Sequence, residues 1–248
     1  MNETIRTQLN HRSIRKFKQK AVPQEIITQL VDVARHTATS NFMQSYSIIG
    51  ISDKEKMSEL SRICQQPYVA QASHIFLFVA DQFRNQQIAD SQNQETSVLH
   101  NMDRFMIAMT DASLAIQNVN VAAESLGLGT VFLGSVLNDA PAVIELFNLP
   151  NMTFPILGLA VGYPDQEPQL KPRLPQTLMY FENSYPEVLP LNDTLASYDN
   201  DVTQYYDLRD ANTRVDSFTK QITDGMNRKM PKRLDLLNQI RQQGLIKE

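Results

Sequence analysis

The chain has 248 residues, a formal net charge of −4 and a single cysteine. This length allows one sizeable core with a smaller appendage. The acidic balance argues against nucleic-acid or anionic-membrane partners, and one cysteine excludes an intrachain disulfide framework. The polar start, MNETIRTQLN, lacks the apolar run of a signal peptide, and no segment approaches the roughly 18 apolar residues of a membrane span. We therefore expect a cytoplasmic protein.

The first hundred residues alternate helical and strand-like patterns. Apolar residues recur at helical spacing over 23–37, and residues 54–63 also predict a short helix. Two runs rich in β-branched and aromatic residues, SIIGI at 47–51 and IFLFVA at 75–80, predict strands. The polar residues that follow, 81–100, are rich in Gln and Asn and predict a connection or a weak helix.

The dominant predicted helix covers 102–126 and is apolar on several sides, which is typical of a helix buried all round or lying in an oligomer interface. TVFLG at 130–134 and FPILGLAV at 154–161 predict the remaining central strands. Between them we expect a helix over 139–149, capped by Asp139 and with Pro141 in its first turn. Strands alternating with helices predict an α/β sandwich of mixed strand direction.

The composition changes at about residue 164. Prolines recur from 164 to 190 and predict an extended, irregular passage. A helical tail follows over roughly 193–209 and 216–243, without the apolar pattern of an independent core. We therefore expect a core domain over 1–163 and a helical excursion over 186–248 that packs on the core or on a partner subunit.

Several familiar catalytic motifs are missing. The sequence has no G-x-G-x-x-G or G-x-x-x-x-G-K-[ST] loop, no C-x-x-C, no H-E-x-x-H and no G-x-S-x-G. The four histidines are scattered, so we expect neither a metal site nor a catalytic histidine. If the protein is an enzyme, a bound cofactor supplies the difficult chemistry.

Two basic clusters, far apart in the sequence, offer the donors that an anion requires. HRSIRKF at 11–17 carries two arginines and a serine, and LKPRLP at 170–175 carries a lysine and an arginine. Each alone could be a solvated charged segment, but together they favour one anionic ligand held from two sides. The segment ATSNFMQ at 38–44, with Gln66 and Tyr68, adds neutral groups that suit a heterocycle or a ribityl chain, or that simply cap a helix.

Collinear segments over most of the chain resemble the nitroreductase superfamily, in its subgroup of oxygen-insensitive NADPH nitroreductases and NADPH–flavin oxidoreductases. The segments are HRSIRKF (11–17), ATSNFMQSYSII (38–49), YVAQAS (68–73), AAESLGLGTVFLGS (122–135), LKPRLP (170–175), ENSY (182–185) and YYDLRDANTR (205–214). The resemblance implies an α+β fold with a mixed central sheet flanked by helices. It also implies a homodimer with one FMN per subunit at the dimer interface.

Carried over by position, the resemblance implies a set of FMN contacts. The phosphate and ribityl end would be held by His11, Arg12, Ser13 and Arg15. Lys171 and Arg173, on the segment 170–185 that returns to the flavin, would complete the flavin site. The other flavin contacts would be Thr39, Ser40, Asn41, Gln66, Tyr68, Phe132, Leu133, Gly134 and Ser135. Gly134 fits this role because a missing side chain lets the backbone approach a planar ligand.

The activity that the resemblance implies is hydride transfer from NADPH, through FMN, to small acceptors such as nitroaromatics and quinones in a ping-pong cycle. This chemistry takes place on FMN and needs no catalytic side chain. Arg209 and Arg214 match positions that bind the extra phosphate of NADPH, although both also fit a charged helix end. Two alternatives stay open: an NADPH–flavin reductase that supplies free reduced flavin, and a flavin-binding protein with little turnover.

Overall fold

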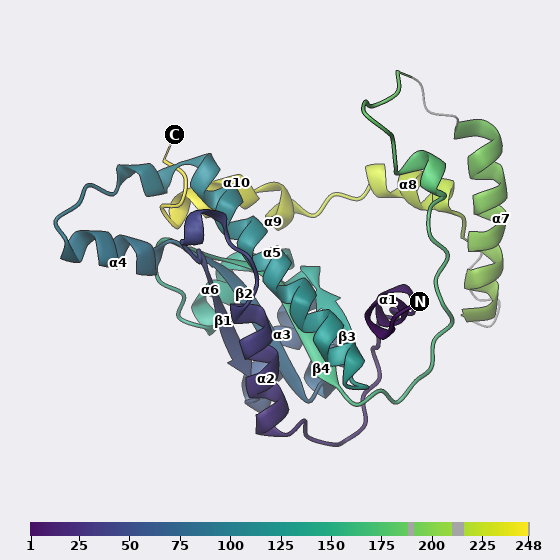
Figure 1. The fold of residues 1–248 in the computed structure, drawn as a ribbon, viewed down its shortest axis with the longest axis horizontal. Coiled ribbons are helices and arrows are strands. Elements are labelled where there is room, and N and C mark those ends of the chain that lie inside the picture. The colour runs from purple at the N-terminus through teal and green to yellow at the C-terminus, as the bar shows by residue number, and fades with distance from the viewer. Residues whose placement is uncertain (188–190, 210–215, 248) are drawn as a thin grey trace. The chain divides into compact units, whose positions relative to one another are not determined.

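The computed structural model describes residues 1–187, 191–209 and 216–247. They form two compact units (Figure 1): unit 1 comprises Met1–Glu167 with Met230–Glu248, and unit 2 is Pro168–Lys229. None of the helices in the described part of the chain is both long and apolar enough to cross a membrane.

Unit 1 is built on a four-stranded sheet in the order β1-β2-β4-β3. The strands are β1 Tyr46–Ile51, β2 His74–Asp81, β3 Gly129–Leu133 and β4 Thr153–Gly162. All three strand pairs are antiparallel. The mixed strand direction expected from the sequence is therefore not found among these strands. Alternation of strands and helices does not determine direction: Ile51 at the end of β1 pairs with Ile75 at the start of β2, so the connection brings the chain back to the same end of the sheet.

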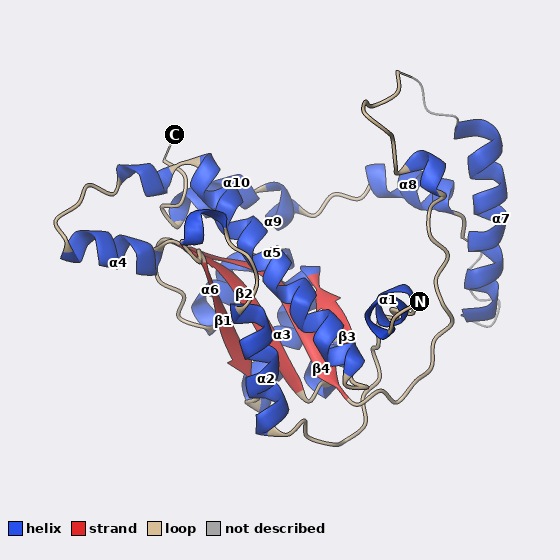
Figure 2. Ribbon diagram, viewed as in Figure 1, coloured by secondary structure: helices blue, strands red, loops and turns tan. Residues whose placement is uncertain are grey.

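Helices cover both faces of the sheet (Figure 2). On one face α2 (Gln24–Arg35) and α5 (Met102–Ser125) bury a cluster that includes Leu30, Phe78 and Ile116. On the other face α3 (Lys54–Cys64) and α6 (Ala140–Leu146) bury a cluster that includes Leu60 and Leu77. The neighbours Leu77 and Phe78 enter opposite clusters because successive side chains of a strand point to opposite faces.

The remaining elements are short. Unit 1 also contains α1 Glu3–Leu9, α4 Phe83–Ser91, α9 Pro231–Leu234 and α10 Leu236–Gln242, and the 3-10 turns η1 Ser40–Phe42, η2 Pro67–Gln71, η3 Ser97–His100 and η4 Gly134–Asp139. Unit 2 contains η5 Gln176–Leu178, α7 Leu191–Arg209 and α8 Phe218–Met226. In unit 2, Tyr198 and Phe218 join α7 to α8 through rings whose centroids lie 5.3 Å apart.

Most of the predicted elements are confirmed. Asp139 caps α6 by accepting a hydrogen bond from the backbone N of Ala142 at 3.4 Å, and Pro141 lies in the first turn as expected. The polar stretch 81–100 contains the helix α4 and the turn η3. The predicted helix over 216–243 is instead divided into α8, α9 and α10. Pro231 begins α9, and a proline cannot continue a preceding helix because it lacks the backbone N–H.

The helix α5 is not buried on all sides within one chain. Ala108, Ala112 and Ile116 face the sheet with at most 1 % of their surface exposed. Met106 and Leu114, on the other side of the helix, are 53 % and 49 % exposed. The single chain therefore leaves an apolar side of its longest helix uncovered.

His74, at the start of β2, makes the fold sensitive to acid. Its ring packs on Phe76 with centroids 4.6 Å apart, and its Nε2 is buried without a hydrogen-bond partner in the described structure. Burial lowers the pKa of His74 from 6.5 to about 4. The unfolded chain binds this proton near pH 6.5 and the folded chain only near pH 4, so stability falls as the pH drops through this window.

Because the unfolded chain takes up this proton first, we expect the free energy of unfolding to fall by about 2 kcal/mol when the pH is lowered from 7 to 5. Urea unfolding of the wild type and of His74→Gln at pH 7, 6 and 5 measures this contribution as the difference between the two pH dependences. Equal pH dependences in the two proteins would rule out the assignment to His74.

Candidate functional site

The predicted phosphate-binding segment lies beside β3. Ser13 forms a parallel bridge with Thr130, and the backbone N of Ile14 donates to the carbonyl of Thr130 at 2.7 Å. Because the bridge is parallel, the chain from Ser13 to Arg15 runs in the same direction as β3 toward Phe132. Ile14 itself is buried in the core and anchors the segment.

Arg12 has a donor that no described residue uses. Its Nη1 donates to the carbonyl of Asn10 at 3.3 Å, but its Nε is buried without a partner in the described part of the chain. An unpaired buried donor costs free energy, so Arg12 fits an acceptor supplied by a ligand. His11 is already engaged, since its Nδ1 lies 2.5 Å from Oε1 of Glu124.

Arg15 connects this segment to the turn after α3. Its guanidinium carbon lies 5.9 Å from the centroid of the Tyr68 ring. Its backbone N donates to Oε1 of Gln166 at 3.0 Å. Gln66, at the start of the same turn as Tyr68, accepts a hydrogen bond at its carbonyl from Oγ of Ser61 at 3.0 Å.

The end of β3 completes this group of residues. Ser135 hydrogen-bonds to the thiol of Cys64, whose pKa is raised by burial. A Cβ placed on Gly134 would find its nearest neighbour, Cδ1 of Leu157, only at 4.0 Å, so the space beside this glycine is open. The structure thus brings together three predicted segments: 11–15, 66–68 and 132–135.

Arg233 is a residue of this region that the sequence did not single out. It comes from α9, and its Nη1 donates to the carbonyl of Gly134 at 2.9 Å and to Oδ1 of Asn138 at 3.3 Å. The only signal in the sequence was the basic run RKMPKR at 228–233. Its contacts place a further cation against the loop that follows β3.

Thr39, Ser40 and Asn41 lie elsewhere in the chain. The backbone N of Ser40 donates to Oδ1 of Asp111 at 3.0 Å, which holds this segment against α5. No hydrogen bond or ring contact of the described residues joins it to the segment 11–15. Within one chain the predicted flavin contacts of unit 1 are therefore found in two places.

The other predicted cations belong to unit 2. Lys171 and Arg173 are exposed, and Nη1 of Arg173 donates to the carbonyl of Lys171 at 3.0 Å. Arg209 is the last residue of α7, and its side chain lies outside what is described. Arg214 lies outside the described residues altogether.

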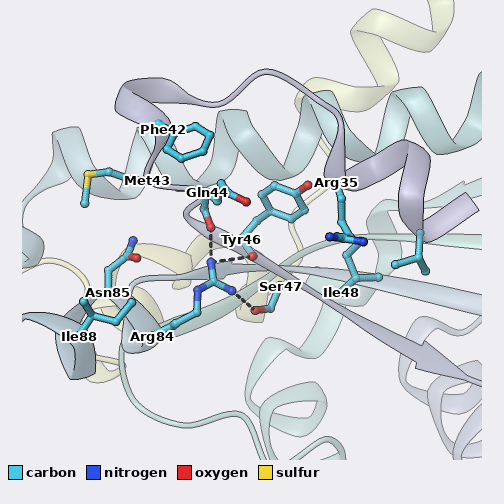
Figure 3. A pocket seen from close by; sticks show the side chains of 11 residues that line it. Arg35, Phe42, Met43, Gln44, Tyr46, Ser47, Ile48, Arg84, Asn85 and Ile88 are labelled. Atoms are coloured by element: carbon cyan, nitrogen blue, oxygen red, sulfur yellow. Dashed lines mark hydrogen bonds between the residues drawn. The ribbon is translucent and has the colours of Figure 1, made fainter. Parts of the chain in front are cut away.

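A cavity of about 610 Å³ opens near the segment 39–41 (Figure 3). It is lined by Arg35 from α2, by Phe42 and Gln44 from the loop before β1, and by Arg84 and Ile88 from α4, among others. Tyr46 also lines it, and burial, with the Asp111 carboxylate as a second cause, raises the pKa of this phenol. None of the predicted site residues lines this cavity. Among the described residues, no group of three or more His, Cys, Asp or Glu side chains could hold a metal ion.

Comparisons with known proteins cover nearly the whole chain. Residues 9–163 match the nitroreductase family, and residues 171–248 match the nitroreductase family, C-terminal domain. The chain is 41 % identical over 232 residues to the protein named FMN reductase (NADPH) of Bacillus subtilis, covering 92 % of this chain and 93 % of that protein.

Two solved structures are similar throughout. The NfrA1 nitroreductase from B. subtilis has a TM-score of 0.92 and 39 % identity, with 98 % of each chain covered. The NADPH:FMN oxidoreductase from Vibrio harveyi, solved with NAD+, has a TM-score of 0.87 and 31 % identity, with 100 % of each chain covered. The chain belongs to the nitroreductase family.

Proposed function

We propose that the protein is an FMN-dependent NADPH oxidoreductase that reduces nitroaromatics and quinones. The observation that carries the proposal is the Nε of Arg12, which is buried and has no partner among the described residues. Its segment runs beside the open backbone at the end of β3. A flavin reductase that supplies free reduced flavin is the second candidate, and the name of the Bacillus subtilis relative, FMN reductase (NADPH), favours it.

The residues present fit FMN. Arg12 and Arg15 offer planar donors to a phosphate, and Gly134 leaves room for a flat ring beside its backbone. From this group we assign His11, Arg12, Ser13, Arg15, Gln66, Tyr68, Phe132, Leu133, Gly134 and Ser135 to FMN. On their match to the family motifs we also assign Thr39, Ser40, Asn41, Lys171 and Arg173. When bound, FMN supplies the uptake of hydride from NADPH and its delivery to the acceptor.

We also propose a homodimer. The side of α5 that carries Met106 and Leu114 is apolar and exposed in one chain. The segment 39–41 lies against the same helix, through the bond from Ser40 to Asp111. In a dimer packed on this side of α5, each flavin could receive the segment 39–41 of the other subunit. The single, buried Cys64 fits a reducing compartment such as the cytoplasm.

Visible spectroscopy of the purified protein is the first test of the function. We expect a flavin spectrum that bleaches faster with NADPH than with NADH under anaerobic conditions, and that recovers when a nitroaromatic or a quinone is added. Free FMN as the acceptor, in the same assay, compares the two candidate activities. A protein that stays colourless after incubation with FMN contradicts the proposal, and bound flavin that neither nucleotide reduces favours a flavin-binding protein.

The preference for NADPH gives a separate prediction. We assign Arg209 and Arg214 to the extra phosphate of NADPH, on their match to the family. Arg209→Ala should raise KM for NADPH about tenfold, the effect of losing one charged hydrogen bond, and leave KM for NADH unchanged. Steady-state kinetics with both nucleotides measures this. A parallel rise in both KM values would remove Arg209 from the phosphate site.

A further inference from the structure

Three residues of one short loop have a backbone conformation that L-amino acids rarely adopt. Asn41, Phe42 and Gln44 have φ angles of +52°, +58° and +49°. Non-glycine residues in this region are strained, and they persist only where the surroundings hold them. Clusters of such residues are found at functional sites. The loop 40–45 contains two of the proposed flavin contacts, Ser40 and Asn41, and its Phe42 is 84 % exposed.

Asp111 holds the loop from the side of α5. The residue is 1 % exposed, and its carboxylate accepts hydrogen bonds from the backbone N of Ser40 at 3.0 Å and of Ser45 at 3.3 Å. The two oxygens thus bind the two ends of the strained segment. A buried carboxylate that accepts backbone hydrogen bonds makes strong, charge-assisted contacts.

Arg84 holds the same loop from the side of α4 (Figure 3). Its Nη2 donates to the carbonyl of Gln44 and, at 3.3 Å, to the carbonyl of Tyr46. Its Nη1 donates to Oγ of Ser47 at 3.3 Å and lies 3.8 Å from Oδ2 of Asp81. The planar guanidinium can reach these separate acceptors together, which a lysine ammonium cannot.

We propose that Asp111 and Arg84 are positioning residues that hold the loop 40–45 in its strained form, and so set the place of Phe42 and of the flavin contacts before it. The inference rests on the proposed function. It assigns no chemistry to Asp111 or Arg84 themselves. Their effect on the reaction comes from orienting the loop that the acceptor meets.

Substitutions of the two positioning residues should have different effects. Arg84→Lys loosens the end of the loop near Gln44, so kcat/KM for the acceptor should fall about tenfold while Kd for FMN changes less than twofold. Asp111→Asn replaces one accepting oxygen with an amide donor that faces a backbone N–H, so it should weaken FMN binding as well. Arg35→Lys is the matched control, because Arg35 lines the same cavity but its Nη1 pairs with Asp32 of its own helix, at 2.7 Å, and makes no hydrogen bond to the loop 40–45.

Glycine rescue separates positioning from a general loss of structure. A glycine adopts φ near +50° without strain, so Gln44→Gly in the Arg84→Lys background should restore kcat/KM at least threefold. Met43→Gly in that background is the control, because Met43 has an ordinary φ of −79° and should restore nothing. Equal recovery by both glycines, or recovery by neither, overturns the proposal.

Hydrogen exchange of the flavin-free protein gives a readout that does not depend on activity. The amides of residues 40–46 should exchange faster in Arg84→Lys and in Asp111→Asn than in the wild type, and Arg35→Lys should match the wild type. If exchange is unchanged in both Arg84→Lys and Asp111→Asn, the inference is overturned and the proposed function stands. A wild type that takes up no FMN overturns the proposed function, whatever the exchange shows.

Discussion

Arg15→Ala should weaken FMN binding by about 1.5–3 kcal/mol, which is roughly a 10- to 150-fold rise in Kd. Arg15 follows β3 toward Phe132, and its guanidinium makes a ring contact with Tyr68 but no hydrogen bond to a described residue. Its donors are therefore available to a phosphate. Removing them takes away charge-assisted hydrogen bonds without disturbing an internal ion pair of the described residues.

Fluorescence titration of the apoprotein with FMN measures this effect. Lys16→Ala is the matched control, because Lys16 is the next residue, carries the same charge and is exposed. Arg15→Lys should give an intermediate Kd, since it keeps the charge and loses the planar fork. If Arg15→Ala and Lys16→Ala bind FMN alike, Arg15 is not a phosphate ligand.

Gly129→Ala should destabilise the fold and the site together. A Cβ at this position would lie 2.7, 2.8 and 2.9 Å from Cγ1, Cβ and Cγ2 of Ile14. These atoms belong to a buried, branched side chain next to a backbone bridge, so they cannot simply swing away. We expect a loss of about 1–3 kcal/mol in unfolding free energy, typical of an overpacked core.

The same substitution should also weaken FMN binding, because the displaced segment carries Arg12, Ser13 and Arg15. Denaturant unfolding and FMN titration of one preparation measure the two effects. Gly225→Ala is the control: a Cβ there meets no atom within 4 Å, and alanine in α8 should leave stability unchanged or raise it by up to about 1 kcal/mol. Normal stability of Gly129→Ala would show that Ile14 is not held against this glycine.

The secondary structure was largely predictable because it depends on local periodicity. The run IFLFVA at 75–80 became β2, His74–Asp81, and the long apolar pattern over 102–126 became α5. Strand direction was not predictable in this way. It depends on the end of the sheet to which each connection returns the chain. The pairing of Ile51 with Ile75 exists only once the sheet has formed.

The candidate site was predictable as a set of donors and not as an arrangement. The resemblance to a family named Arg12, Arg15 and Gly134, and those assignments stay a proposal. That Ser13 bridges Thr130, 117 positions later in the chain, appears only when the sheet has formed. Arg84 and Asp111 carried no signal, because a lone charged residue in a helical pattern looks like any other.

The sequence by itself determined most of the helices and strands, the family and the residue types that suit a phosphate and a flat ring, since each of these depends on a local pattern or motif. Only the tertiary structure decided that the segment 39–41 lies against α5 instead of beside Arg12. It also decided that Asp111 and Arg84 both hydrogen-bond to the same strained loop. Such contacts join residues far apart in the chain, and their geometry is created by packing.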